Sequence, residues 1–380
     1  MTDAQPPLAL EVFEPPDGGV AEHVLTLCRG LQARGFAVAA AGPPEAQIYS
    51  ELESDGIEVH RVRFRRDYRH PHDDVRAGKQ LDALLTARQP TIVHFHASKA
   101  GAVGRVAAAR HRLPLLYTPH CFGFVGDVGR MRRALVPVAE RILGRVTDRI
   151  ICVSEAEIDV ARQDRIGRPN RLRLIRNGVP APNPELRVDP QLAELAVGGP
   201  LLANIGVMRP QKRQDLFLEA ARLVLARHDG VRLALVGSGP LEEALRQRSA
   251  ELGLDRHPRF RLLSFSPPVG RYLMALDGFV LSSGWEALPI SLLEALASGV
   301  PQVATAIDGN TEIVTPDTGV LVPPSDPEGL ADGMLTLLRR DPEAMASASR
   351  RRHRALFTVE QMLNETAALY RELLGAGNGD

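Results

Sequence analysis

Short apolar runs alternate with amphipathic segments of helical length along most of the chain. The first run is Leu8–Phe13, and an amphipathic stretch follows over about residues 20–34. This alternation is typical of a parallel α/β sheet with crossover helices. The further strands predicted before residue 180 are Phe36–Ala41, Ile57–Phe64, Thr91–Phe95, Pro114–Thr118, Arg149–Val153 and Arg171–Ile175.

The alternation stops between Val179 and Pro200, where five prolines fall within 22 residues. Proline lacks the N–H that sheet pairing needs, so the pattern predicts a hinge over residues 181–200. Further strands are predicted at Leu201–Val207, Val231–Gly237, Phe260–Phe265, Gly278–Ser282 and Val300–Thr305. We therefore expect two Rossmann-like, doubly wound domains that face each other across a cleft. They span residues 1–180 and 201–358, and a final helix near 359–374 packs back on the first.

The amino-acid composition argues against several classes of protein function. The 46 basic and 46 acidic residues cancel, and aromatic residues make up only 4% of the 380, which argues against nucleic-acid binding. Three widely spaced cysteines indicate neither a disulfide framework nor a cysteine zinc site. No apolar run is long enough to span a membrane, and the first residues lack a secretion signal pattern. A cytoplasmic protein with at most peripheral membrane contact is expected.

Loops that follow the predicted strands carry the first candidate site residues, because ligands of open α/β sheets bind at the carboxyl ends of strands. Glycines there allow close approach of a ligand to the backbone. One loop also holds two cations before a helix, where an anion such as a diphosphate would bind. Taken alone, each glycine or cationic loop is also consistent with an ordinary turn, and His120 with a structural histidine. The candidates are Gly18, Gly19, His120, Gly206, Arg209, Lys212 and Gly237.

The segment from Ser282 to Pro301 is the most informative. A strand ends, Glu286 follows in a loop, and Pro289 suits a first helical turn, while Gly299 closes the helix. The free N–H groups at the helix start form an anion site. The candidate residues at this helix start are Leu288, Pro289, Ile290 and Ser291; all but the proline, which has no N–H, supply such groups.

Two acids bracket this helix start. Glu286 and Glu294 are about 12 Å apart if their separation is measured at helical rise. One carboxylate could hold a sugar and the other a ribose, with phosphates between them. A surface helix with an incidental acid is the alternative. No Asp-x-Asp pair and no metal-ligand spacing occurs, so we expect no metal and no cofactor, with Lys212, Arg209 and the helix start meeting the phosphate charge.

These residues together resemble the GT-B retaining glycosyltransferases of glycosyltransferase family 4, over nearly the full chain. The Glu286-x7-Glu294 block is the specific match, and the glycine loops are not. The other matching segments are Gly18-Gly19, residues 92–96, 117–120, 151–155, 175–179, 205–212, 236–240, 308–312 and 319–324.

The resemblance implies a metal-independent transferase that moves a hexosyl or N-acetylhexosaminyl group from a nucleotide diphospho-sugar, with retention. It implies Glu286 near the donor sugar and Glu294 at the ribose. It places Lys212 at the diphosphate and His120 near the reacting centre. One departure is Val207, where members often carry arginine after the glycine; Arg209 is the candidate substitute.

Thr118–Phe124 resembles members that extend cell-surface polysaccharides on lipid-linked precursors, so a lipid-linked glycan is the expected acceptor. A helix near Arg130–Arg149 interleaves cations with apolar residues, as an interfacial helix at the inner face of the cell membrane would. A solvated face over a core stripe is equally consistent. A sugar-nucleotide epimerase, a phosphorylase and a non-catalytic partner subunit remain alternative functions.

Overall fold

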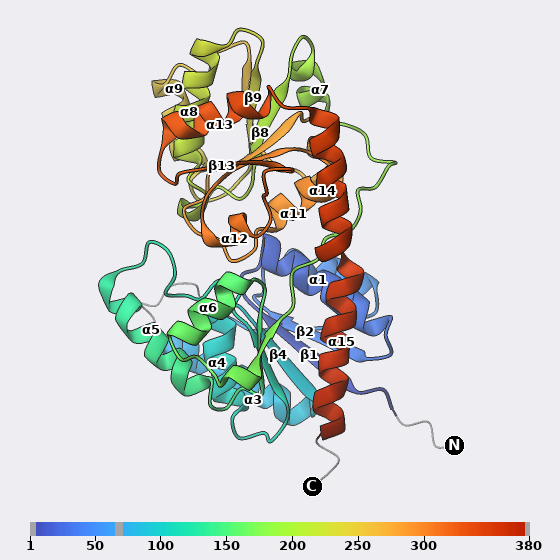
Figure 1. Cartoon of the computed structure of the whole chain (residues 1–380). Coiled ribbons are helices and arrows are strands. Elements are labelled where there is room, and N and C mark those ends of the chain that lie inside the picture. Colours follow the sequence, from blue (N-terminus) through green and yellow to red (C-terminus); the bar gives the residue numbers. More distant parts are fainter. Residues whose placement is uncertain (1–4, 65–70, 377–380) are drawn as a thin grey trace. The chain divides into compact units, whose positions relative to one another are not determined.

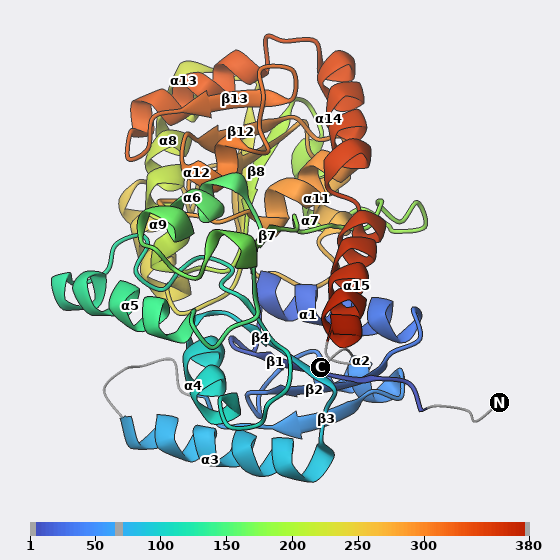
Figure 2. The same ribbon diagram turned by 60° about the horizontal axis from the view of Figure 1, so that its bottom comes forward.

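The computed structural model describes residues 5–64 and 71–376 (Figures 1 and 2). These residues form two α/β units. Unit 1 contains the described residues up to Asn177 and those from Val359 onward, and unit 2 is Gly178–Thr358.

Unit 1 has a seven-stranded parallel sheet with the order β3-β2-β1-β4-β5-β6-β7. The strand order reverses between β1 and β4, which is the switch point where ligands bind in such sheets. The strands are β1 Leu8–Phe13, β2 Ala37–Gly42, β3 Glu58–Arg61, β4 Ile92–His96, β5 Leu115–Thr118, β6 Arg149–Cys152 and β7 Leu172–Leu174.

Helices cover both faces of this sheet. Side chains alternate along β1, so that Ala9 and Phe13 belong to one core cluster while Leu10 and Val12 belong to the other. Helix α15 lies beside α1 on the first face, and α3 lies beside α4 (Figures 1 and 2). The helices are α1 Gly19–Gln32, α2 Tyr49–Ser54, α3 Pro71–Arg88, α4 Ser98–Ala108, α5 Arg130–Leu143, α6 Glu155–Gln163 and α15 Val359–Ala376, with a 3-10 turn η1 Pro169–Arg171.

Unit 2 repeats the plan with six parallel strands in the order β10-β9-β8-β11-β12-β13, so its switch point lies between β8 and β11. The strands are β8 Leu201–Ile205, β9 Arg232–Val236, β10 Phe260–Leu263, β11 Gly278–Leu281, β12 Gln302–Thr305 and β13 Gly319–Val322. The helices are α7 Pro190–Ala196, α8 Gln214–Arg227, α9 Glu242–Glu251, α10 Gly270–Leu273, α11 Ile290–Ser298, α12 Asp308–Thr311, α13 Pro327–Leu337 and α14 Pro342–Leu356, with a 3-10 turn η2 Pro210–Lys212.

The two doubly wound parallel sheets confirm the predicted fold class, with differences in detail. The proline-rich segment 181–200 belongs to unit 2 and contains α7, which contacts β9. Pro190 occupies the first turn of α7, where its missing N–H costs nothing, and the Asp189 side chain caps that turn. Strand β13 is an element that the apolar pattern did not predict. None of the helices in the described residues is long and apolar enough to cross a membrane.

Candidate functional site

The switch point of unit 2 brings together two loops that carry predicted site residues. Strand β8 leads through Gly206 into η2, where Lys212 is the last residue. Strand β11 leads through Ser283 to Glu286 and then into α11. Because both loops leave the same end of neighbouring parallel strands, their side chains meet.

The Glu286 carboxylate is the centre of this group. Lys212 Nζ lies 2.6 Å from Glu286 Oε1, and Ser283 Oγ donates to the same oxygen at 2.8 Å. Gln211 Nε2 donates to Oε2 at 3.1 Å and to the Trp285 carbonyl at 2.9 Å. The Glu286 side chain is only 8% exposed. Donors on two loops therefore fix both carboxylate oxygens, and the carboxylate and the ammonium neutralise each other.

A buried network of hydrogen bonds from the end of β12 and from α12 supports the Glu286 loop. Thr305 Oγ1 donates to the Ser283 carbonyl at 2.7 Å, and Asn310 Nδ2 donates to the Thr305 carbonyl at 2.9 Å. A Cβ at Gly309 would lie 2.4 Å from the Ala287 carbonyl oxygen, so only glycine permits this approach of α12 to the loop. The position of Glu286 thus depends on residues at the end of β12 and in α12.

Packing requires the glycine of the β9 loop, whereas the glycine of the β8 loop has room for a Cβ. A Cβ at Gly237 would lie 2.2 Å from the Gly206 carbonyl oxygen, while one at Gly206 would lie 3.9 Å from Lys212 Cε. Gly206, Gly237 and Lys212 are therefore neighbours, because β8 and β9 are adjacent strands. Arg209 is the N-cap residue of η2 and is partly buried, with a buried Nε.

Helix α11 begins at Ile290, with Pro289 as its N-cap residue, rather than with Pro289 in its first turn as predicted. Leu288 and Pro289 are buried, and Ile290 and Ser291 are partly exposed. Gly299 ends the helix in the left-handed conformation, as predicted. Glu286 lies in the loop ahead of the helix, so its separation from Glu294, which is inside α11, is not set by helical rise.

The switch point of unit 1 gathers a second group of polar side chains. Glu11 lies on β1, His94 and His96 lie on β4, and Thr118 ends β5. Because Glu11 pairs in register with His94, and His96 with Thr118, the two-residue period places all four on the face that α1 and α15 cover. All four are buried.

A continuous hydrogen-bond network joins these residues to α15. Tyr370 Oη donates to Glu11 Oε1 at 2.8 Å and lies 2.7 Å from His94 Nδ1. His96 Nε2 lies 2.9 Å from Glu11 Oε2. An ionised carboxylate only accepts hydrogen bonds, so His96 Nε2 carries the proton and His96 Nδ1 keeps its lone pair.

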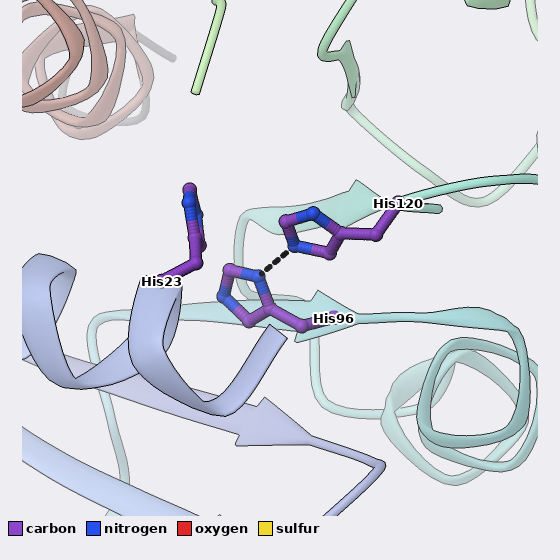
Figure 3. Close-up of side chains that lie close together, drawn as sticks. All are labelled: His23, His96 and His120. Atoms are coloured by element: carbon purple, nitrogen blue, oxygen red, sulfur yellow. Dashed lines mark hydrogen bonds between the residues drawn. The ribbon is translucent and has the colours of Figure 1, made fainter. Parts of the chain in front are cut away.

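His120 joins the network through this lone pair. His120 Nε2 lies 3.1 Å from His96 Nδ1 and must be the donor in that bond (Figure 3). His120 itself has a positive φ of 52°, and the Cys121 φ that follows is 101°, so the loop is held in a conformation that non-glycine residues rarely adopt. His23, on α1, has its ring centroid 4.7 Å from that of His120.

The histidines of this group are neutral at pH 7. Burial, together with the neighbouring histidines, lowers the pKa of His96 to about 4 and that of His23 to about 3. The same causes bring the pKa of His120 well below its ordinary value. Burial would raise the pKa of Glu11, but hydrogen bonds from His94 and His96 outweigh it, so that its pKa is lowered.

A buried acid also anchors the His120 loop. Glu157 Oε1 accepts the Cys121 N–H and Glu157 Oε2 accepts the Val153 N–H, each at 2.8 Å. Burial outweighs these bonds and raises the pKa of Glu157 to about 7. The predicted pair Gly18 and Gly19 lies at the start of α1, where Gly18 is the N-cap residue with a φ of 73°.

Several residues of both groups were not predicted from the sequence. Gln211, which precedes Lys212, and Ser283, three positions before Glu286, are ordinary loop residues in sequence. Glu11 gave a usable signal, because an acid inside an apolar strand needs a buried partner. Tyr370 gave none, since 359 positions separate it from Glu11.

Helix α5 carries an exposed apolar stripe. Met131, Leu135, Val138 and Ile142 recur at intervals of four, three and four residues, and each is between 46% and 75% exposed. These side chains, with Val146 after the helix, therefore do not form the core stripe that was one of the two interpretations. Arginines flank the stripe at positions 130, 141 and 145, all of them exposed.

Comparison with known proteins places both units in one group. Residues 18–178 match the family model described as a glycosyl transferase 4-like domain, and residues 199–340 match the model described as glycosyl transferases group 1. Unit 1 and unit 2 thus each match their own model.

Individual relatives agree. An Escherichia coli UDP-Gal:α-D-GlcNAc-diphosphoundecaprenol α-1,3-galactosyltransferase is 28% identical over 63% of this chain and 64% of its own length. A D-inositol 3-phosphate glycosyltransferase from Geodermatophilus obscurus is 32% identical over 73% of this chain and 66% of its own length. The crystal structure of Anabaena HepE with UDP and glucose matches 96% of this chain and 99% of its own, with a TM-score of 0.80 and 19% identity.

Proposed function

Because this chain belongs to the group 1, family 4 glycosyltransferases of the GT-B fold, we propose that it transfers a hexosyl or N-acetylhexosaminyl group from a nucleotide diphospho-sugar to an acceptor hydroxyl, with retention of configuration. The observation that carries the proposal is the Glu286 carboxylate, held by Lys212, Gln211 and Ser283 just ahead of the start of α11.

The charges at this position suit a donor with a diphosphate. The N–H groups at the start of α11 and the Lys212 ammonium attract phosphate oxygens. The Lys212–Glu286 pair has no net charge, so we propose that the N–H groups at the start of α11 and Arg209 supply the remaining positive charge in place of a divalent metal ion. Arg209 is the second proposed cation. It takes the role of the arginine that family members often carry at the position of Val207.

The two acids have different proposed roles. A carboxylate accepts hydrogen bonds from neighbouring hydroxyl groups, and Glu286 is fixed in both oxygens before a donor arrives. We assign Glu286 to the hydroxyls of the transferred sugar and Glu294 to those of the ribose. We assign to His120, in unit 1, the role of a neutral ring whose Nδ1 lone pair can accept a hydrogen bond from a hydroxyl group.

The acceptor that fits best is a lipid-linked glycan in cell-surface polysaccharide or glycolipid assembly. Two observations support it: the name of the E. coli relative specifies a diphosphoundecaprenol acceptor, and α5 exposes apolar side chains beside arginines. Such a helix binds in the interface of an anionic membrane, with its apolar side chains among the lipid chains. We propose that α5 makes a peripheral contact with the inner face of the cell membrane.

The test is a transfer assay with a short-chain diphosphoprenyl N-acetylhexosamine as acceptor, after a thermal-shift comparison of UDP-, GDP- and ADP-sugars has chosen the donor. We expect a glycosylated product whose new anomeric centre has the configuration of the donor, as read by NMR. We also expect EDTA to leave the rate unchanged. Turnover that vanishes with EDTA and returns with magnesium would contradict the proposal, as would conversion of the donor without acceptor.

Membrane contact through α5 gives a separate prediction. The double variant Leu135→Ser/Ile142→Ser should lower binding to vesicles that contain an anionic phospholipid by at least tenfold, because two apolar side chains no longer enter the lipid. Co-sedimentation measures this. The double variant Val75→Ser/Val106→Ser removes similarly exposed apolar side chains from α3 and α4 and should bind as the wild type does. Equal losses in both variants would exclude α5 as the contact.

A further inference from the structure

Three histidines from separate elements of unit 1 converge at one point (Figure 3). His23 comes from the first turns of α1, His96 from the end of β4, and His120 from the loop after β5. One ring nitrogen of each lies within 4.8 Å of the other two. The closest pair, His96 Nδ1 and His120 Nε2, is 3.1 Å apart.

This spacing suits a tetrahedral metal ion. Zinc binds histidine nitrogens at 2.0–2.1 Å, which places neighbouring ligand nitrogens roughly 3.3 Å apart. The His23 ring would have to turn toward the other two rings to supply the third ligand. His23 Nδ1 is buried and has no hydrogen-bond partner in the part of the chain that the structure describes. That nitrogen is the orphaned polar atom that a bound ion would satisfy.

The residues that are hydrogen-bonded to His96, directly or through Glu11, also resemble the residues around a metal site. Glu11 accepts the Nε2–H of His96, so the lone pair of this ring is on Nδ1 and faces His120. Tyr370 holds the other oxygen of Glu11. A carboxylate that orients a ligating histidine in this way is common in zinc proteins and raises the affinity for the metal.

A second group of side chains, Glu11, His94 and His96, is less suited to bind a metal ion. Both nitrogens of His94 are occupied, since Nδ1 lies 2.7 Å from Tyr370 Oη and Nε2 lies 2.7 Å from Thr118 Oγ1. Both oxygens of Glu11 are also bound. A metal ion there would have to break bonds that are already made.

We propose that His23, His96 and His120 bind a divalent transition metal of the zinc type, and that occupation of this site stops sugar transfer. Imidazole nitrogens select zinc, copper, nickel or cobalt, whereas magnesium and calcium require oxygen ligands. The inhibitory part rests on the proposed function, because it depends on the role of His120 in transfer.

Binding needs only one rearrangement of protons. In the metal-free protein the His120 proton is on Nε2, where it is donated to His96. On binding, this proton moves to Nδ1 through solvent, the ring stays neutral, and the Nε2 lone pair turns to the metal. His120 Nδ1 then carries a hydrogen, so it no longer accepts a hydrogen bond from a hydroxyl group. Three ligands leave the fourth position of the ion to water.

Cobalt binding to the full-length protein tests the site independently of activity. We expect one Co²⁺ per chain with the visible absorption of a tetrahedral site. His23→Gln and His120→Gln should each weaken the binding at least tenfold. Glu11→Gln removes the carboxylate that orients His96 and should weaken Co²⁺ binding roughly 10- to 100-fold. His257→Gln removes a histidine from unit 2 and should have no effect. Binding that survives both ligand variants, or that is lost equally in His257→Gln, would overturn the site.

Zinc inhibition of transfer tests the second part. Micromolar zinc should reduce the wild-type rate at least tenfold, and EDTA should restore it. His23→Gln should keep the basal rate and resist zinc, since His23 has no part in the proposed transfer. Co²⁺ binding at the cluster without loss of transfer would overturn the inhibition and leave the site standing. A chain that shows no transfer under any condition would instead refute the proposed function.

Discussion

Glu286→Gln is expected to reduce kcat for sugar transfer by at least a hundredfold. The substitution keeps the shape of the side chain but removes the charge, which Lys212 and Ser283 now hold at 2.6 and 2.8 Å. A transferred sugar that this carboxylate no longer holds in position is expected to react about a hundredfold more slowly. Steady-state kinetics with the donor chosen by thermal shift measures the loss.

Two controls separate this effect from damage to the fold. Glu243→Gln, an exposed acid on α9 in the same unit, should keep the wild-type rate. The Glu286→Gln protein should still be stabilised by the nucleoside diphosphate, because its phosphate contacts are assigned to Lys212 and the start of α11. A Glu286→Gln variant with full activity would remove Glu286 from the reaction.

His120→Asn is expected to reduce kcat by about a hundredfold, the scale of effect that a positioned proton donor or acceptor has. The neutral ring presents a lone pair on Nδ1. The amide oxygen of asparagine can lie near the same position, but it is far less basic than an imidazole nitrogen and does not take up a proton from a hydroxyl group. Donor binding should be unchanged, because the proposed donor contacts lie in unit 2. His111→Gln, which removes a histidine paired with Asp82 in the same unit, is the matched control.

The pH profile adds a second readout for His120. Burial and the neighbouring histidines keep its pKa well below the usual value of 6.5. The lone pair is lost only on protonation, so the wild-type rate should not fall as the pH decreases from 7.5 to 6 on account of this group. A rate that halves near pH 6.5 in the wild type, and no longer does so in His120→Asn, would show a different protonation state.

Local signals in the sequence predicted the two parallel sheets and pointed to the loop that carries Glu286. The parallel strands follow from apolar runs with crossover spacing, and Lys212 and Glu286 meet because both follow neighbouring strands at a switch point. The sequence does not predict helix α7, because prolines usually break helices, although Pro190 stands where a helix accepts it. Strand β13 is a short apolar run, Gly319–Val322, that the strand prediction did not include, and its length does not distinguish it from β11 or β12.

The histidine cluster could not be predicted because no local pattern encodes it. His23 looks like any polar residue on an amphipathic helix, and no ligand spacing connects positions 23, 96 and 120. Only the strand order, which places β1 between β2 and β4, brings α1 to the ends of β4 and β5. The partner of the Glu11 carboxylate, Tyr370, depends in turn on where α15 packs.

Unit 1 is built from two separate parts of the chain, and this affects when its elements can pack together. Its sheet is synthesised first, but α15, which covers Glu11 and supplies Tyr370, is the last helix of the chain. Gly178–Thr358 is continuous in sequence, so unit 2 takes none of its strands or helices from elsewhere in the described chain. Unit 1 is complete only when α15, which follows all of unit 2 in the chain, packs beside α1 and brings Tyr370 to Glu11.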